Sequence, residues 1–267
     1  MELGKTSVYE SKYNPERLFA IPRRPKREEL GITGELLPFV GYDLWNHYEV
    51  SWLDQRGKPQ VATAQIAYPC DSEFIIESKS MKLYFNSLNN TRFESIDVLR
   101  DTIAADLSSR LKANVSVVVN PLQDQMHRII SPLEGVCIDD AEIDVEDFAL
   151  NPQYLETERW QAEEMLYSNL LKSNCLVTGQ PDWGSVWIKY RGKKISREGL
   201  LRYIVSFREH HEFHEQCVER IFVDIMRMCE PASLTVGARY TRRGGIDINP
   251  VRSTQNQKIA NPRLIRQ

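Results

Sequence analysis

Apolar and polar residues alternate, though not strictly, over two stretches near the start of the chain, residues 45–53 and 60–68. Alternation with a period of two places one face of an extended segment in a core and leaves the other face in water. Between the stretches lie Gly57 and Pro59, which favour a loop and the edge of a strand. The pattern therefore predicts a β-hairpin whose loop spans residues 54–59.

The spacing of apolar residues changes to a helical period after Glu77. One face of this segment carries apolar residues at i, i+3, i+4 and i+7, namely Met81, Tyr84, Phe85 and Leu88. A second apolar stripe over residues 93–111 predicts another helix, and β-branched residues at 115–119 predict a strand. A further strand is expected to begin at 127–130, which gives the order β-β-α-α-β-β.

The same order recurs in the second part of the chain, after a linker. The linker is acidic from residue 139 to 147, and its last part, residues 155–172, is predicted to form a connecting helix. The elements expected next are a strand at 185–190, a helix capped by Ser196, a helix ending near Cys229, and strands at 233–240 and 245–250. Two copies of one unit, an α+β fold made by tandem duplication, account for this repetition.

These elements divide the chain into four parts. Residues 1–40 are rich in Pro, Lys and Arg and are expected to form an extended arm on the surface. The first unit is expected over residues 41–135, the linker with its connecting helix over 136–172, and the second unit over 173–267. The basic residues of the arm are expected to be solvated rather than to bind nucleic acid, because the whole chain is slightly negative.

Composition narrows the class of protein. The chain has 267 residues, of which 42% are hydrophobic and 27% charged, the balance of a folded globular protein. Its net charge of −3 gives no general attraction to nucleic acid or to an anionic membrane. No apolar run reaches the roughly 20 residues that span a bilayer, and residues 1–12 lack the apolar core of a signal peptide. A cytoplasmic location is therefore expected.

The first of four motifs that could carry chemistry contains a cysteine. The five cysteines of the chain are scattered without a C-x-x-C pair, which argues against a disulfide framework or a structural zinc site. Cys175 follows the predicted connecting helix, and Asp182 comes seven residues later. A thiol needs a nearby base to act as a nucleophile at neutral pH, and Asp182 could take that proton. A buried cysteine with a loop-capping aspartate is the alternative.

Two further motifs place carboxylates at predicted helix starts. His214 and Glu215 are neighbours, and an imidazole beside a carboxylate suits both proton delivery and hydrogen bonding to a substrate. Glu77 precedes Ser78 and Lys79 at the start of the earlier helix, where its carboxylate could accept paired N–H donors. In both places the alternative is an acidic residue that only stabilises a helix N-terminus.

The fourth motif is a glycine turn between two predicted strands. Arginines flank Gly244 and Gly245, and guanidinium groups beside accessible backbone N–H groups form a receptor for anions. The segment is neither a G-x-G-x-x-G fingerprint nor a Walker loop, so a Rossmann or P-loop assignment fails. The alternative is a charged β-hairpin without a ligand.

Taken in order, the four motifs resemble one family. They are E-S-K-S-M-K-L-Y at 77–84, C-L-V-T-G-Q-P-D at 175–182, F-H-E at 213–215 and T-R-R-G-G-I-D-I at 241–248. Together they are similar to the NADPH-dependent 7-cyano-7-deazaguanine reductases, the nitrile reductases of queuosine biosynthesis, in their long two-module form. The resemblance covers nearly the whole chain. It implies tandem tunnelling-fold units with antiparallel sheets and helices on one face, a homodimer, and no metal ion.

The resemblance also implies a role for each motif. Cys175 corresponds to the nucleophile that adds to the nitrile, Asp182 to the proton donor and His214 to a group that assists it. Contacts to the substrate are implied for Ile76, Glu77, Ser78, His214 and Glu215. Contacts to the cofactor, NADPH, are implied for Ser78, Lys79, Arg243 and Gly244. Two NADPH molecules would then reduce the covalent thioimide to a primary amine.

Two other functions remain alternatives. A tunnelling-fold hydrolase of the GTP cyclohydrolase type would act on a purine or pterin and commonly holds zinc through Cys and His. A catalytically silent nucleotide-binding module would form no adduct between Cys175 and a nitrile. A metal assay, an NADPH-oxidation assay and a test for the adduct separate the three.

Overall fold

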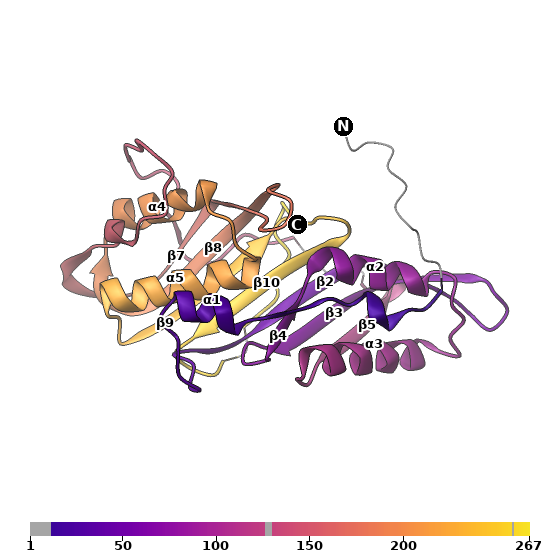
Figure 1. Ribbon diagram of the computed structural model, residues 1–267. Helices are drawn as coiled ribbons and strands as arrows, with labels where there is room; N and C mark the ends of the chain where they lie inside the picture. The colour runs from indigo at the N-terminus through magenta and orange to yellow at the C-terminus, as the bar shows by residue number, and fades with distance from the viewer. Residues whose placement is uncertain (1–11, 126–129, 258) are drawn as a thin grey trace.

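The computed structural model describes residues 12–125, 130–257 and 259–267, and an eight-stranded sheet runs through it (Figure 1). The strand order is β5-β3-β2-β10-β9-β8-β7-β6, and neighbours are antiparallel except for β6 and β7. The strands are β2 (Val40–Leu53), β3 (Pro59–Pro69), β5 (Ser116–Pro121), β6 (Val136–Cys137), β7 (Thr157–Asn174), β8 (Pro181–Ile195), β9 (Ser233–Tyr240) and β10 (Ile246–Ser253). A separate two-stranded sheet pairs β1 (Ala20–Pro22) with β4 (Phe74–Ile76).

Helices pack on this sheet in two groups (Figure 1). The α-helices are α1 (Arg24–Glu29), α2 (Ser78–Leu88), α3 (Ile96–Leu111), α4 (Arg197–Val205) and α5 (His214–Cys229). Short 3-10 turns lie at η1 (Pro15–Arg17), η2 (Leu122–Gln125), η3 (Pro152–Tyr154) and η4 (Ser206–Glu209). Helices α2 and α3 share a core with β2, β3, β5 and the start of β10, whereas α4 and α5 share one with β7, β8 and β9.

The two groups repeat one order of elements, a hairpin followed by two helices and further strands. We call β2 to β5 the first half and β7 to β10 the second half. The halves join where β10 pairs with β2, from Ile246 opposite His47 to Ser253 opposite Val40. The expected α+β class with antiparallel pairing is confirmed. Of the strand expected at 127–130, residues 127–129 lie outside the described residues, and Ile130 forms an isolated bridge.

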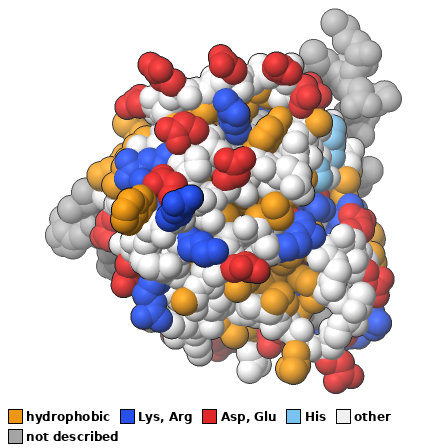
Figure 2. All heavy atoms as spheres, turned by 90° about the vertical axis from the view of Figure 1, so that its left-hand side faces the viewer, with side chains coloured by type: hydrophobic (Ala, Val, Ile, Leu, Met, Phe, Trp, Pro, Cys, Tyr) orange, Lys and Arg blue, Asp and Glu red, His pale blue; other side chains and the backbone are white. Residues whose placement is uncertain are grey.

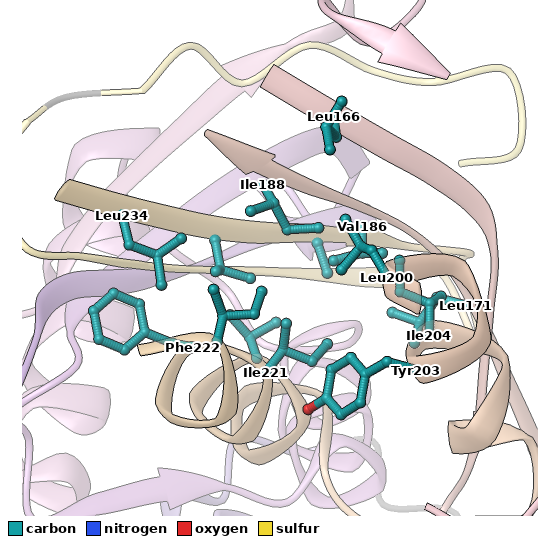
Figure 3. Close-up of a cluster of buried hydrophobic side chains, with 14 of the residues drawn as sticks. Leu166, Leu171, Val186, Ile188, Leu200, Tyr203, Ile204, Ile221, Phe222 and Leu234 are labelled. Atoms are coloured by element: carbon teal, nitrogen blue, oxygen red, sulfur yellow. The ribbon is translucent and has the colours of Figure 1, made fainter. Parts of the chain in front are cut away.

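Each core fills the space between helices and sheet with apolar side chains. Figure 3 shows the core of the second half, where side chains from strands and helices interdigitate: Leu166, Val186, Ile188, Leu234, Leu200, Ile204, Ile221 and Phe222. Ile246 and Ile248 of β10 belong to the core of the first half. The second half therefore contributes to both cores, which fixes the two halves against each other.

The helix expected over residues 155–172 is wrong, because this stretch is strand β7. Its sequence contains many residues that favour helices, and its apolar residues are not evenly alternating. Register shifts interrupt its pairing with β8 between Thr157 and Gln161 and again between Ser168 and Leu171. Such bulges move the buried positions from one parity to the other. An interrupted strand thus acquires apolar spacings that resemble a helix.

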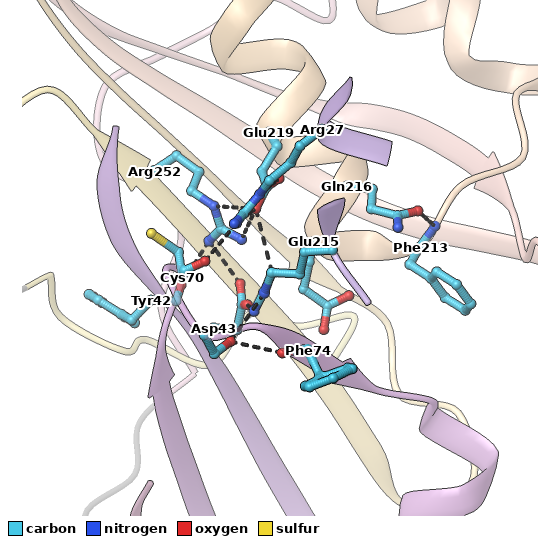
Figure 4. Close-up of polar contacts among 12 residues, drawn as sticks. Arg27, Tyr42, Asp43, Cys70, Phe74, Phe213, Glu215, Gln216, Glu219 and Arg252 are labelled. Carbon is cyan, nitrogen blue, oxygen red and sulfur yellow. Dashed lines mark hydrogen bonds and ion pairs between the residues drawn. The ribbon is translucent and has the colours of Figure 1, made fainter. Parts of the chain in front are cut away.

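The surface arm expected over residues 1–40 is also wrong in part, because Arg23 and Arg27 are buried. With Asp43, Glu219 and Arg252 they form what we call the ion cluster (Figure 4). Arg27 binds Glu219 at 2.7 Å and Arg252 binds Asp43 at 2.8 Å, while Arg23 pairs with both carboxylates. Removing one member of a buried ion pair typically costs about 3–5 kcal/mol, so this cluster fixes the segment to both halves.

The surface at the end of the molecule formed by the second half carries both acidic and basic side chains. Figure 2 shows acidic and basic side chains interspersed there, with acidic ones along the upper rim and hydrophobic side chains between them. Fields of opposite sign partly cancel at such a surface. The described part of this face therefore presents both signs of charge rather than one.

Candidate active site

A pocket of about 680 Å³ opens where the two halves meet. The first half contributes the junction of β4 and α2. The second half contributes the β7–β8 loop, the start of α5 and the β9–β10 turn. Every site residue predicted from the sequence lines this pocket: Ile76, Glu77, Ser78, Lys79, Cys175, Asp182, His214, Glu215, Arg243 and Gly244. Their shared position is a finding, whereas their individual roles stay predictions.

Cys175 opens the loop between β7 and β8, which we call the cysteine loop (residues 175–180). It follows a strand rather than the helix expected before it. Two backbone hydrogen bonds close the loop: Cys175 N–H donates to the Gln180 carbonyl at 2.8 Å, and Gly179 N–H donates to the Cys175 carbonyl at 2.9 Å. Gly179 has φ +65°, a conformation that favours glycine. The thiol is half-buried at the pocket wall.

Asp182 stands on β8 just beyond the cysteine loop, opposite Ser173 of β7. Its Oδ2 lies 3.4 Å from Nε2 of His214, and its Oδ1 accepts a hydrogen bond from Arg243. Burial raises the pKa of Asp182, but hydrogen bonds and charge from His214 and Arg243 outweigh burial, so the pKa lies below its usual value. Asp182 is therefore ionised at neutral pH, which is the form that can accept a proton.

His214 is held by the ring of Tyr240. The two rings stack at a centroid distance of 3.9 Å and an interplanar angle of 23°. His214 is the first residue of α5, as the sequence predicted, and Tyr240 ends strand β9. This stacking fixes the plane of the imidazole while its edge faces Asp182.

Glu215 follows on α5 and is almost fully buried beside the ion cluster (Figure 4). Its carboxylate is 3.4 Å from the Tyr68 hydroxyl, a long contact for a hydrogen bond. Burial, with repulsion from Asp43, raises the pKa of Glu215 to about 7, although His214 and Arg23 oppose the shift. An ionised carboxylate has about four acceptor positions, so Glu215 retains capacity for donors on a ligand.

Glu77 caps the N-terminus of α2. Its Oε1 accepts from Lys79 N–H at 2.9 Å and its Oε2 from Ser80 N–H at 2.7 Å. The alternative, an acidic residue that stabilises a helix N-terminus, is therefore confirmed, and the same side chain also lines the pocket, where its binding role stays a prediction. Each carboxylate oxygen keeps a second lone pair that can face the pocket. The backbone before it is also tied down, since Glu77 N–H donates to the Phe19 carbonyl at 2.9 Å.

The β9–β10 turn brings one arginine into the pocket. Gly244 (φ +59°) and Gly245 (φ +76°) form a tight reversal between Arg243 and Ile246, and only glycine adopts two such residues readily. Arg243 lines the pocket. Arg239 instead binds Asn261 at 2.6 Å, away from the turn.

Sequence reasoning missed several lining residues. Lys82 is the clearest, because it lies three positions after Lys79 and therefore on the same side of α2. A Cβ on Gly244 would lie 2.9 Å from Lys82 Nζ, so this ammonium group packs against the turn. The others are Val177, Thr178, Gln180, Phe213, Thr241, Ile246 and Ile248. All of these residues lie inside the four motifs, so their place in the motifs could have identified them as pocket residues.

Comparison with known proteins assigns the family. Residues 9–119 match the family model "Nitrile reductase, 7-cyano-7-deazaguanine-reductase N-term", and residues 181–259 match the model "QueF-like protein". The NADPH-dependent 7-cyano-7-deazaguanine reductase of Legionella pneumophila (strain Corby) is 56% identical over 269 residues, covering 100% of this chain and 94% of that protein. The chain belongs to the 7-cyano-7-deazaguanine reductase family. The resemblance drawn from the four motifs is thereby confirmed.

Other matches vary in strength. The protein of the same name from Azoarcus sp. (strain BH72) is 53% identical over 258 residues, covering 97% of this chain and 92% of that protein. The crystal structure of the archaeosine synthase QueF-Like in the apo form covers 38% of this chain and 99% of its own, with 14% identity and a TM-score of 0.32. That structural likeness is too low to bear on the fold.

Within the reductase family, this chain shows two further features. Among residues 12–125, 130–257 and 259–267, no group of three or more His, Cys, Asp or Glu side chains could hold a metal ion. In the same ranges no helix is long and apolar enough to cross a membrane.

Proposed function

We propose that this chain reduces the nitrile of 7-cyano-7-deazaguanine to the aminomethyl group of 7-aminomethyl-7-deazaguanine with NADPH, a step of tRNA queuosine biosynthesis. Family membership supports the activity, since the relatives carry this name. The observation that carries the proposal is the common pocket, in which a thiol, a buried carboxylate and an imidazole meet.

Cys175 is proposed as the nucleophile. Its Sγ forms a bond to the nitrile carbon, one π bond of the C≡N group opens, and the nitrogen takes a proton to give a thioimide. The proton balance closes within the pocket, because ionised Asp182 accepts the thiol proton and passes it to nitrogen. His214, 3.4 Å from Asp182, assists by stabilising the carboxylate.

Glu77 and Glu215 are proposed to bind the deazaguanine edge. Its ring N–H and exocyclic amino groups are donors, and a carboxylate is an acceptor, so charge-assisted hydrogen bonds form. Glu215 is buried, where such bonds are stronger than in water. Ile76, Ser78 and His214 complete the substrate contacts.

Ser78, Lys79, Arg243 and Gly244 are proposed to hold NADPH, which when bound supplies the hydrides for reduction of the thioimide. The described side chains fit this role, because Lys79, Lys82 and Arg243 bring positive charge to one part of the pocket. The Gly244 turn adds backbone N–H groups beside the Lys82 ammonium group that packs against it. Neighbouring groups of this kind suit the phosphates of a dinucleotide.

We also infer the broader organisation. The repeated order of elements supports two tunnelling-fold units, with the second beginning at β7 rather than at residue 173. We propose a cytoplasmic homodimer that acts on the free base without direct contact to nucleic acid. The net charge of −3 gives no general attraction to nucleic acid.

The decisive experiment omits NADPH. Purified protein is mixed with 7-cyano-7-deazaguanine and its intact mass is measured. We expect the mass to rise by one substrate per chain, and no rise in a Cys175→Ala variant. NADPH added afterwards should be oxidised at two equivalents per amine formed. Absence of an adduct together with absence of NADPH oxidation would reject the function and favour a silent binding module.

A further inference from the structure

Arg243 contacts two parts of the catalytic apparatus at once. Its Nη1 donates to Asp182 Oδ1, and its Nη2 donates to Oε1 of Gln180. Gln180 is the last residue of the cysteine loop, and its carbonyl accepts the hydrogen bond from Cys175 N–H. One guanidinium therefore ties the nucleophile's loop to the carboxylate that handles its proton.

The fold directs this side chain toward the loop. The Arg243 N–H donates to the Ile246 carbonyl at 2.9 Å, which fixes the residue at the start of the tight glycine reversal. The side chain of its neighbour Arg242 packs on a different residue, with its guanidinium 4.4 Å from the centre of the Tyr48 ring. The two arginines have similar chemistry but different surroundings, so Arg242 provides a matched control.

The proposed cofactor role of Arg243 conflicts with these contacts. A guanidinium presents its N–H donors as a planar fork that binds one carboxylate or one phosphate in the same way. The side chain is 38% exposed whereas that of Asp182 is 4% exposed, so a ligand can reach the arginine from the pocket. A phosphate that takes this fork therefore competes with Asp182 and Gln180.

We propose that Arg243 is a positioning residue that holds Asp182 ionised and the cysteine loop closed until a phosphate of the cofactor takes its guanidinium. The proposal rests on the proposed function. In the free pocket Asp182 is then a base suited to the thiol proton. With the cofactor bound, Asp182 loses a positive neighbour and holds a solvent-derived proton more readily, as each hydride addition to carbon requires a proton on nitrogen.

The groups around Asp182 support this sequence of events. His214 faces it from α5, Arg243 faces it from the β9–β10 turn, and the buried Tyr240 of β9 lies behind the imidazole. Burial raises the pKa of Asp182, and hydrogen bonds and charge from His214 and Arg243 lower it. When Arg243 is withdrawn, burial and His214 remain, and the balance moves toward the protonated acid.

The test measures the rate of adduct formation without NADPH, by intact mass, between about pH 3 and 8, a range that extends below the usual pKa of an aspartate because that of Asp182 is lowered. Saturating nitrile keeps the protonation of Glu215 from limiting binding. In Arg243→Ala we expect the acidic limb of the rate to move to higher pH by about one unit or more, the usual influence of one arginine on a carboxylate. Arg243→Lys should move the acidic limb part of the way back toward its wild-type pH, and Arg242→Ala should leave the pH profile unchanged.

NADP⁺ is the second probe, because it carries the cofactor's phosphates without a hydride. Its binding is measured by calorimetry, and the adduct profile is then repeated at saturation. With NADP⁺ bound, we expect the acidic limb of the wild-type rate to move to higher pH, as it does in Arg243→Ala. NADP⁺ should cause no additional shift in Arg243→Ala. Unchanged profiles despite adduct formation and NADP⁺ binding would overturn the coupling. Absence of any adduct in the wild type would instead reject the proposed function.

Discussion

The hairpin loops of the two halves occupy corresponding places but use their side chains differently. In the β2–β3 loop the Asp54 carboxylate accepts from Arg56 N–H and Lys58 N–H, both at 2.9 Å, and from the Gln60 amide at 3.1 Å. That carboxylate stabilises its own loop. Backbone hydrogen bonds close both loops, but in the β7–β8 hairpin the side chain of the first loop residue, Cys175, lines the pocket.

For the first helices of the two halves the contrast is reversed, because here the first half supplies the residue that lines the pocket. Ser196 caps α4 by accepting from Gly199 N–H at 3.1 Å, and it does not line the pocket. Glu77 caps α2 and lines the pocket as well. The first half therefore contributes a helix start and the second half a loop. Corresponding elements of the two halves therefore contribute differently, and residues of both halves line the pocket.

The largest expected effect comes from making the second loop chemically inert like the first. Cys175→Ala should abolish both the nitrile adduct and NADPH oxidation, because no other described thiol lines the pocket. Cys217→Ala is the matched control, since Cys217 is fully buried inside α5. Intact mass and NADPH absorbance measure both variants. Full turnover by Cys175→Ala would end the covalent mechanism.

Asp182→Asn should have the next largest effect. Binding of the nitrile should survive, while adduct formation slows by roughly 10²–10⁴-fold, the usual range for a lost general acid–base. The amide keeps the shape of the carboxylate but accepts no proton. Rapid-quench mass spectrometry gives the rate, and an equilibrium titration on a Cys175→Ala background gives the affinity. A rate equal to wild type would remove Asp182 from the chemistry.

Glu77 tests the contribution of the first half. Glu77→Ser keeps a side chain that caps helices and removes the carboxylate, so it separates the two functions of this residue. Titrated on a Cys175→Ala background, the nitrile should bind about 10- to 100-fold more weakly, which corresponds to about 1.5–3 kcal/mol for a hydrogen bond to a charged group.

Ser196→Ala is the control from the second half. It removes the equivalent cap and should lower stability by about 1 kcal/mol without changing nitrile affinity. Thermal unfolding and the same titration measure the two quantities. Equal affinity in the Glu77→Ser and parent proteins would place substrate recognition entirely in the second half.

The smallest effect is a pH dependence of nitrile affinity. The pKa of Glu215 is raised to about 7, so the ionised acceptor is present above pH 7 and is lost as the pH falls through it. On the Cys175→Ala background, affinity should decrease about tenfold per pH unit below 7. Glu215→Gln should bind more weakly at pH 8 and show no such slope. A slope that persists in Glu215→Gln would assign the titration to another group.

The titration of Glu215 affects the stability of the folded protein in the opposite direction from nitrile affinity. An ordinary glutamate in the unfolded chain has a pKa of about 4.3. The raised pKa means that the folded protein holds this proton more tightly than the unfolded chain does. Its contribution therefore stabilises the folded protein at low pH, and it is lost as the pH rises through about 7. Neutral pH favours the acceptor that binds substrate at some cost in stability.

The sequence predicted the site more successfully than the connections around it. Cys175 and Asp182 are close in sequence, and so are His214 and Glu215, so each pair could be recognised locally. Strand β7 could not be recognised locally, because its bulges break the apolar alternation that identifies a strand. The error did not displace Cys175, since the loop follows Asn174 whichever element precedes it.

The ion cluster illustrates a second limit. A run of basic residues near Arg23 indicates a solvated segment unless its partners are known. Those partners are far away along the chain, since Arg27 and Glu219 are separated by 192 positions. Only the folded arrangement brings them together. The same holds for the competition at Arg243, because its contact with Asp182 spans 61 positions.

The pairing of β10 with β2 has a consequence during synthesis on the ribosome. One edge of β2 is covered early by β3, but the other waits for β10, and the associated contact of Asp43 with Arg252 spans 209 positions. At roughly 5–20 residues per second, that edge waits for about 10–40 s. An unpaired strand edge is a template for other chains. Newly made first halves therefore need either rapid completion or a chaperone that shields β2 until the last strand emerges.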